Sequence, residues 1–428
     1  MNMSKGGCVM NNRAFRSIMV VGFSLLCLLS SDDLKAHAAG ETSYPRIMGM
    51  NIGKKNYDDP KYSDALSRLN VVILGFYPGW KGGTAAMEAA VQAIKERNPK
   101  ILIGQYTILT ETPDANDRSS ADFDRGRKLD KEDWWLLDEK GKRVQWTDQY
   151  NAFETNITHW TRSDENGLRY PEWLARRDYD LYFKIPGFDI WYFDNALSKP
   201  AVKSADWKRS GRDDVHSDPE MAKVHREGHV AEWQQAQQLR PDAFLMGNSD
   251  DLSSSEFSGK LHGAFLEALI GKSWSMERWQ GWGRTMSRYH ETMAHTAPPH
   301  LVGFNVWGKK DDYQRMRYGL SSSLMDNGYF CYTDKKVGYS SVVWFDEYDL
   351  DLGAVIDPPA VQPWKNGVYR RNFEKGTVLV NPNGSPASVT LEPGFKRFKG
   401  MQAPEVNNGL PVQNIILPGK DGILLIRD

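Results

Sequence analysis

The segment Gly187-Phe-Asp-Ile-Trp-Tyr-Phe-Asp194-Asn195 is an apolar run that ends on an acidic residue and an amide. Such a run predicts a buried β-strand with the carboxylate of Asp194 at its carboxyl end. In barrels built from alternating strands and helices, catalytic residues lie at this end of the strands. A second run, Gly263-Ala-Phe-Leu-Glu267-Ala-Leu-Ile, carries one glutamate on a similar predicted strand. Two isolated carboxylates on apolar strands indicate an acid/base or nucleophile pair.

Strand-like and helix-like segments alternate on both sides of these two strands. Apolar runs predict six further strands, at residues 46–52, 71–77, 100–106, 243–248, 300–307 and 329–332. Near-continuous apolar runs of this kind are typical of a parallel sheet that is buried on both faces. Asp-Pro pairs at 59–60 and 218–219 predict helix starts, Thr84 is predicted to cap another helix, and residues 275–296 form a further predicted helix. Eight strand-helix units predict a (β/α)8 barrel over residues 44–353.

Two segments depart from this alternation. A long insertion at about 108–180 is rich in tryptophan and in charge, and loops of such length are usually functional or carry small elements of their own. After a proline-rich break at 357–363, short strands separated by turn residues predict an antiparallel β-sandwich over residues 364–428. The predicted fold class is α/β: a (β/α)8 TIM barrel followed by a small C-terminal antiparallel β-sandwich domain.

The first residues have the pattern of a secretion signal. Basic residues precede an apolar run at 18–29, and Ala36-His-Ala38 provides the small-x-small pattern of a signal-peptidase site. The apolar run is too short to span a bilayer comfortably. Residues 1–38 are therefore predicted to be a signal peptide. The mature protein is expected to be exported, periplasmic or secreted, with no membrane anchor after cleavage and with Cys331 as its one cysteine, so without an internal disulfide.

Composition limits the possible partners. The formal net charge of −1 gives no overall field that would attract nucleic acid or an anionic membrane, so no nucleic-acid partner is expected. Aromatic residues make up 12% of the chain. Exposed aromatic faces stack on sugar rings, but large hydrophobic cores also contain many aromatic residues, so this content alone does not distinguish the two roles. The chain lacks a glycine-rich phosphate loop before a helix and a Gly-x-Ser-x-Gly elbow, so nucleotide and serine-esterase chemistry find no support.

One histidine pair resembles a metal site only at first sight. The segment His225-Arg-Glu-Gly-His229 places two histidines four residues apart on a predicted helix. Its glutamate comes two residues after the first histidine, which fits neither common zinc-binding order. A surface helix is the favoured interpretation, and we predict no catalytic metal and no cofactor.

Each candidate side chain has a structural alternative. Asp194 could be a helix N-cap instead of a catalytic residue. Glu267 could form a buried salt bridge; without such a partner, burial of Glu267 predicts a raised pKa that suits a general acid. Asn248 could anchor a sugar hydroxyl or shape a turn, and the acidic aromatic segment at 344–351 could line a sugar subsite or form a structural turn. The predicted substrate contacts are Asn195, Asn248, Tyr106, Trp307, Trp134, Asp346 and Glu347.

Several segments together resemble bacterial glycoside hydrolases of the hypothetical glycosyl hydrolase family fifteen. They are the strand at 188–195, the strand of Glu267, and residues 134–141, 169–174, 344–353 and 367–382. The resemblance spans nearly the whole mature chain and implies a glycosidase-type (β/α)8 barrel with a C-terminal β-domain. Similarity to polygalactosaminidase and dextranase barrels implies a nucleophile role for Asp194 and an acid/base role for Glu267. The sequence departs from such barrels at Trp191-Tyr192, where smaller aliphatic residues are common.

The sequence therefore predicts an exported glycoside hydrolase that acts on a polysaccharide or oligosaccharide. A retaining mechanism predicts carboxyl groups roughly 5–5.5 Å apart, whereas a gap of about 6.5–9.5 Å indicates inversion. The tryptophan-rich insertion is expected to cover the cleft and stack on sugars. The alternatives are a non-catalytic glycan-binding accessory protein of exopolysaccharide export and a metal-dependent barrel hydrolase.

Overall fold

The computed structural model describes residues 43–113, 118, 120–149 and 151–427. The predicted signal peptide, residues 1–38, lies outside the described residues. Over the part of the chain that is described, no helix combines the length and the apolar composition needed to cross a membrane.

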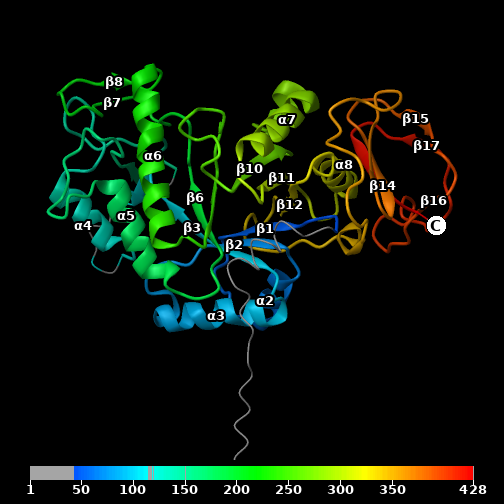
Figure 1. Ribbon diagram of the computed structural model, residues 1–428, viewed down its shortest axis with the longest axis horizontal. Helices are drawn as coiled ribbons and strands as arrows, with labels where there is room; N and C mark the ends of the chain where they lie inside the picture. Colours follow the sequence, from blue (N-terminus) through cyan, green and yellow to red (C-terminus); the bar gives the residue numbers. More distant parts are fainter. Residues whose placement is uncertain (1–42, 114–117, 119, 150, 428) are drawn as a thin grey trace, which may run out of the picture.

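Eight parallel strands form the main sheet, and their order in the sheet follows their order in the chain (Figure 1). A parallel bridge between Ile47 and Phe330 links the first strand to the last, so the sheet closes into a barrel. The prediction of a barrel followed by a C-terminal antiparallel β-domain is confirmed. The barrel strands are β1 (Met48–Asn51), β2 (Val71–Leu74), β3 (Leu102–Ile108), β6 (Ile190–Asp194), β9 (Phe244–Gly247), β10 (Gly263–Ile270), β11 (Leu301–Gly308) and β12 (Tyr329–Asp334).

Side chains of the strands alternate between the barrel interior and the outer layer, as the two-residue period of a strand requires. On β6, Tyr192 belongs to the interior cluster, whereas Trp191 and Phe193 pack in the outer cluster. The same alternation puts Asp194 on the inward face at the carboxyl end of the strand. Trp191 stacks on Phe183 with ring centroids 3.8 Å apart. The bulky Trp191-Tyr192 pair is therefore accommodated because its two members point to opposite faces.

Five helices flank the barrel strands: α2 (Pro60–Ser67), α3 (Thr84–Arg97), α6 (Pro219–Leu239), α7 (Met276–His295) and α8 (Tyr313–Ser323). The predicted Asp-Pro helix starts are confirmed, because the side chains of Asp59 and Asp218 accept a backbone N–H from the first turn of α2 and α6, at 3.0 and 2.8 Å. Thr84 is instead the first residue of α3, and Gly83 occupies the cap position. The prediction that Thr84 caps this helix is wrong by one residue.

The alternation of strands and helices is incomplete. Residues 248–262, all of them described, join β9 to β10 through turns without an α-helix. After β12, the chain forms only a short 3-10 turn at Asp346–Asp349 before it enters the C-terminal sheets. Eight strand-helix units were predicted, but β9 and β12 lack the helix.

The predicted insertion folds as a small unit with its own apolar core. It contains β4 (Glu111–Pro113), α4 (Phe123–Glu132), β5 (Ala152–Glu154) and α5 (Tyr170–Asp178). Trp134, Trp135 and Leu129 are buried together in this core, whereas Trp146 is exposed. Figure 1 shows the unit at one side of the barrel, next to α6. Most of the apolar surface of Trp134 and Trp135 therefore stabilises the insertion itself.

The C-terminal part forms two antiparallel sheets around a separate core. One sheet contains β13 (Tyr369–Phe373), β14 (Gly376–Asn381), β18 (Asp421–Arg427) and β16 (Phe395–Arg397), and the other pairs β15 (Ala387–Thr390) with β17 (Asn414–Leu417). Helix α8 packs against β18 and β14 (Figure 1). The approach is close, since a Cβ on Gly422 would lie 2.2 Å from Oγ of Ser321.

A buried ion pair crosses this contact between the barrel and the C-terminal part. Nε and Nη2 of Arg317 donate to the two carboxylate oxygens of Asp421 at 3.0 and 2.9 Å. The two side chains are only 6% and 4% exposed. Burial raises the pKa of Asp421 although the guanidinium opposes the shift, so desolvation outweighs the attraction. The pair therefore fixes how α8 and β18 dock more than it adds net stability.

Removing one member of this pair is expected to be costly, because the other charge stays buried without a partner. We expect Asp421→Ala to lower the free energy of unfolding by roughly 3–5 kcal/mol in urea denaturation followed by tryptophan fluorescence. The control is Asp180→Ala, which breaks an exposed pair with Lys184 whose side chains are 56% and 64% exposed; its effect should stay below about 1 kcal/mol. Equal stability of the two variants would contradict the assigned role of the buried pair.

Candidate active site

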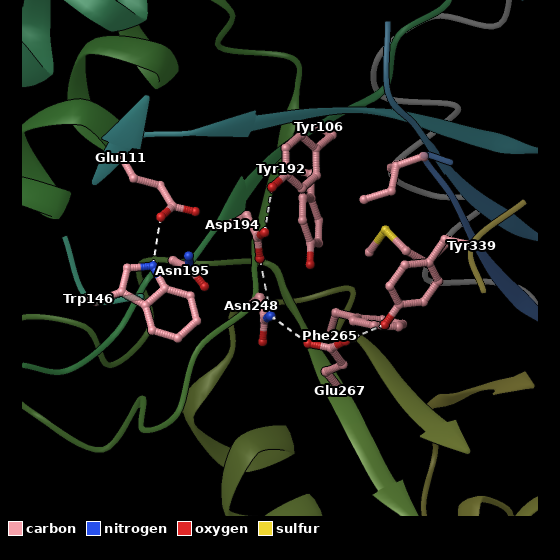
Figure 2. A pocket seen from close by; sticks show the side chains of 12 residues that line it. Tyr106, Glu111, Trp146, Tyr192, Asp194, Asn195, Asn248, Phe265, Glu267 and Tyr339 are labelled. Atoms are coloured by element: carbon pink, nitrogen blue, oxygen red, sulfur yellow. Dashed lines mark hydrogen bonds between the residues drawn. The ribbon is translucent and has the colours of Figure 1, made fainter. Parts of the chain in front are cut away.

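Three neighbouring strands each bring a polar side chain to the carboxyl end of the barrel. Asp194 ends β6, Asn248 directly follows β9, and Glu267 lies in β10. Figure 2 shows the Asn248 amide between the two carboxyl groups. Nδ2 of Asn248 donates to Oδ1 of Asp194 at 3.1 Å and to Oε2 of Glu267 at 3.4 Å, so the sum of the two distances limits the separation of these oxygens to 6.5 Å. The two predicted carboxyl groups therefore converge on one place.

A bulge in β10 directs Glu267 toward this place. The pairing register with β11 shifts between Leu266 and Ile270. Within the shift, Ala268 has a left-handed backbone with φ of 48°, a conformation that residues with a Cβ rarely adopt. The buried amide of Asn305 sustains it, because Oδ1 accepts the Ala268 N–H at 2.9 Å. Bulges of this kind are a common device for re-aiming a side chain next to an active site.

The residue after Asp194 has a similar role. Asn195 has φ of 49°, and asparagine tolerates the left-handed region better than most residues. Its backbone N–H bonds the Asp194 carboxylate, and its side chain lines the same pocket. The Asp-Asn ending of the strand thus turns the chain away while it leaves the carboxylate at the barrel mouth.

Two tyrosines hold the two carboxyl groups from opposite sides (Figure 2). The hydroxyl of Tyr106, in β3, donates to Oδ2 of Asp194 at 2.5 Å. The hydroxyl of Tyr339, in the loop after β12, donates to Oε1 of Glu267 at 2.5 Å. Each carboxyl group therefore has one oxygen on a tyrosine and the other on Asn248, which fixes both in position.

These residues line one pocket of about 420 Å³ at the barrel mouth. The prediction placed Tyr106, Asp194, Asn195, Asn248 and Glu267 here, and the structure brings all five together. The other lining residues were not predicted; they are Met50, Ile52, Glu111, Trp146, Tyr192, Phe265 and Tyr339. Among the described residues that line the pocket, the charged ones are three acids, Glu111, Asp194 and Glu267.

The electrostatics separate the roles of the two central acids. Burial raises the pKa of Asp194, and hydrogen bonds from Tyr106, Asn195 and Asn248 oppose this shift. Burial also raises the pKa of Glu267, and the charge of Asp194 raises it further, against the hydrogen bonds from Tyr339 and Asn248. An ionised Asp194 therefore favours the protonated form of Glu267. The arrangement places two carboxyl groups of different electrostatic environment side by side.

Glu111 is the third acid of the pocket and was missed. It begins β4 in the insertion, and its Oε2 accepts the indole N–H of Trp146 at 2.6 Å (Figure 2). Burial raises the pKa of Glu111, Trp146 opposes this, and the charge of Asp194 adds to the rise. Glu111 lies three residues beyond the end of β3. This position could have identified it from the sequence, because polar residues just after a barrel strand lie at the functional face.

Two tryptophans predicted to contact sugar do not line the pocket. Trp134 is fully buried in the insertion core, where its indole N–H donates to the carbonyl of Arg162 at 2.8 Å. Trp307 is 7% exposed and packs edge-on behind Tyr339 with ring centroids 5.1 Å apart. Nζ of Lys272 covers the Trp307 ring at 3.5 Å. The predicted sugar contacts of Trp134 and Trp307 are wrong because both rings are occupied by protein neighbours.

The acidic residues after β12 also lie elsewhere. Oδ2 of Asp346 accepts the backbone N–H groups of Met401 and Gln402 at 2.6 and 2.7 Å. Oε1 of Glu347 accepts the amide of Asn407 at 2.9 Å. Both side chains bind the C-terminal part of the chain, so the predicted substrate roles of Asp346 and Glu347 are wrong and the structural alternative holds.

The histidine pair on α6 is buried, so the expected surface helix is wrong at these positions. His225 is 5% and His229 0% exposed, with ring centroids 4.9 Å apart. Burial lowers the pKa of His229 to about 3, which keeps this ring neutral. Within the described ranges, no three histidine, cysteine, aspartate or glutamate side chains are grouped so that they could hold a metal ion.

Comparison with known proteins agrees with this geometry. The family model described as hypothetical glycosyl hydrolase family 15 matches residues 95–377. No sequence among the curated proteins compared matches this chain.

Solved structures are similar in fold at low sequence identity. A family GH13_31 enzyme has a TM-score of 0.51 at 11% identity, covering 90% of this chain and 99% of its own. Isomaltulose synthase from Erwinia rhapontici, in complex with sucrose, has a TM-score of 0.50 at 10% identity, covering 89% of this chain and 98% of its own. The glycoside hydrolase domain of PelA from Pseudomonas aeruginosa has a TM-score of 0.42 at 12% identity, covering 68% of this chain and 95% of its own.

Proposed function

The chain belongs to hypothetical glycosyl hydrolase family 15 and is a glycoside hydrolase; from this premise we propose that it cleaves a polysaccharide with retention of anomeric configuration. Asp194 is the proposed nucleophile and Glu267 the proposed acid/base. The observation that carries the proposal is the Asn248 amide, which donates to both carboxyl groups.

The spacing of the two acids favours retention over inversion. Retaining glycosidases hold their carboxyl groups roughly 5–5.5 Å apart, and inverting enzymes about 6.5–9.5 Å apart to make room for a water molecule. The limit of 6.5 Å applies to one pair of oxygens, Oδ1 of Asp194 and Oε2 of Glu267; it supports the shorter, retaining range.

The proposed first step forms a covalent glycosyl-enzyme ester. A carboxylate oxygen of Asp194 attacks the anomeric carbon, and the bond from that carbon to the departing oxygen breaks. The proton of Glu267 passes to the departing oxygen, so the leaving sugar departs as an alcohol. Asp194 suits the attack because hydrogen bonds from Tyr106, Asn195 and Asn248 favour its ionised form.

The second step reuses Glu267 as a base. The ester of Asp194 is uncharged, which removes the charge that raised the pKa of Glu267. The glutamate is now ionised and takes a proton from water as the water oxygen attacks the anomeric carbon. The ester bond breaks, Asp194 regains its charge, and the pKa of Glu267 rises again for the next cycle.

Substitution of the two acids tests the assigned roles. Screening bacterial and plant polysaccharides for new reducing ends identifies a substrate, on which we expect Asp194→Ala to lose at least about a hundredfold in kcat/KM. Glu267→Gln should lose as much on this substrate but far less on an aryl glycoside whose leaving group needs no proton. Proton NMR of the first product should show the retained anomer.

The exposed Asp180→Asn variant is the control and should keep wild-type rates. An inverted first product, or a smaller loss in Asp194→Ala, would contradict the nucleophile role. A protein that binds glycans tightly and releases no reducing ends would instead fit the accessory role.

The two tyrosines provide a separate test through the pH profile of kcat/KM. The active form requires ionised Asp194, which sets the acidic limb, and protonated Glu267, which sets the alkaline limb. The bond from Tyr106 lowers the pKa of Asp194, so Tyr106→Phe should move the acidic limb to higher pH. The bond from Tyr339 lowers the pKa of Glu267, so Tyr339→Phe should move the alkaline limb to higher pH.

Tyr192→Phe is the matched control, because Tyr192 lines the pocket and no bond from its hydroxyl to either acid is found among the described residues. Neither limb should move in this variant. A shift of the same limb in both of the other tyrosine variants would argue against separate roles for the two acids.

We also propose that the mature chain acts outside the cytoplasm, because residues 18–38 have the apolar run and the small-x-small site of a secretion signal. N-terminal sequencing of protein made in a bacterial host should find cleavage after Ala38, and the protein should be in the periplasm or medium. Uncleaved protein retained in the cytoplasm would contradict export.

A further inference from the structure

A second pocket opens beside the first at the carboxyl ends of the barrel strands. It has a volume of about 340 Å³ and shares Ile52 and Tyr106 with the catalytic pocket, so the two are direct neighbours. We call it the Lys55 pocket. Its other lining residues come from the loops after β1 and β2, from β3 and from the insertion; they are Lys55, Gly75, Phe76, Tyr77, Pro78, Thr107, Ile108, Asp122, Arg125, Arg177, Asp178 and Tyr182.

The acids of the Lys55 pocket are already paired. Arg177 contacts Asp122 at 3.4 Å and Asp178 at 3.3 Å. The guanidinium of Arg125 is used as well, since its Nε donates to the hydroxyl of Tyr170 at 2.7 Å and its Nη2 donates to backbone carbonyls. Arg177 is therefore paired with acids, and the N–H groups of Arg125 are occupied by neutral oxygens.

Lys55 is the third cation of this pocket. The side chain of Lys55 is partly buried, and its Nζ forms no ion pair or hydrogen bond with the described residues. Nζ lies 5.4 Å from the ring centroid of Tyr77, a cation–π contact. Burial lowers the pKa of Lys55 and Asp122 opposes the shift. A partly desolvated ammonium without a partner is costly, and an anion that enters the pocket would offset this cost.

The backbone holds Lys55 in place. Its φ is 55°, a left-handed conformation uncommon for a residue with a side chain. The indole N–H of Trp80 donates to the carbonyl of Lys55 at 2.7 Å and fixes this turn. Strained positions of this kind cluster at ligand sites. The adjacent Tyr77 is 42% exposed, and a half-exposed aromatic face suits stacking on a sugar ring.

We propose that the Lys55 pocket is a subsite for the sugar next to the cleaved bond and that this sugar carries a carboxylate, as a uronic acid does. Lys55 pairs with the carboxylate and Tyr77 contacts the ring. The inference rests on the proposed hydrolase function and narrows its substrate to an acidic polysaccharide. The charged residues described around the catalytic pocket are all acids, so the Lys55 pocket is where an acidic sugar is accepted.

Binding of paired probes tests the subsite without requiring hydrolysis. The probes are a hyaluronan tetrasaccharide and a glucuronoxylan oligosaccharide, each beside its carboxyl-reduced form, titrated calorimetrically into the full chain. Wild type should bind an acidic member at least about tenfold more tightly than its reduced form, and the preference should shrink as salt rises. Lys55→Met should abolish the preference, and Lys55→Arg should keep most of it.

The matched control is Lys54→Met, because Lys54 is the preceding lysine on the same loop and lines neither pocket. It should keep the wild-type preference, and thermal unfolding should show that all variants are folded. Equal affinity for both members of each pair, no binding of any acidic probe, or the same loss in Lys54→Met and Lys55→Met would overturn the proposal. Hydrolysis of neutral polysaccharides with no preference for acids would overturn the subsite and leave the hydrolase function standing.

Discussion

The reactive geometry depends on one amide group that bonds two acids. Asn248 lies on the strand between those of Asp194 and Glu267, so the order of strands around the barrel places the donor where it can reach both. Its two N–H groups then limit how far the carboxyl groups can separate. Both acids are followed by a residue in the left-handed region, Asn195 and Ala268. Backbone strain and a shared donor together set the aim of the two side chains.

Charge is distributed unevenly over the functional face. The pocket at the barrel mouth concentrates buried carboxyl groups, and the charge of Asp194 raises the pKa values of Glu267 and Glu111. The adjoining Lys55 pocket contains three cations, Lys55, Arg125 and Arg177, of which Arg177 is paired with nearby acids. Ile52 and Tyr106 belong to both walls, and Tyr106 also bonds Asp194. The two pockets are therefore connected to Asp194 through the side chain of Tyr106.

The sequence predicted the parts of the molecule that depend on local pattern. Apolar runs identified the strands. Asp194 was found as the acidic end of one run and Glu267 as the single carboxylate within another, because alternation and chain direction fix where such residues point. Tyr339, on the loop after β12, and Glu111, in the insertion, escaped prediction because distant contacts set the positions of these segments. Trp134 was misassigned since an indole has the same local signature in a core as on a sugar platform. Burial, which decides between these roles, is a property of the whole fold.

The insertion after β3 has its own apolar core and yet supplies one wall of each pocket, through Glu111 and Trp146 on one side and Arg125 on the other. Since its core is separate from the barrel interior, the wall is modular. Evolution could exchange this unit for another and so change which glycan enters, while the chemistry performed on the barrel strands is inherited unaltered.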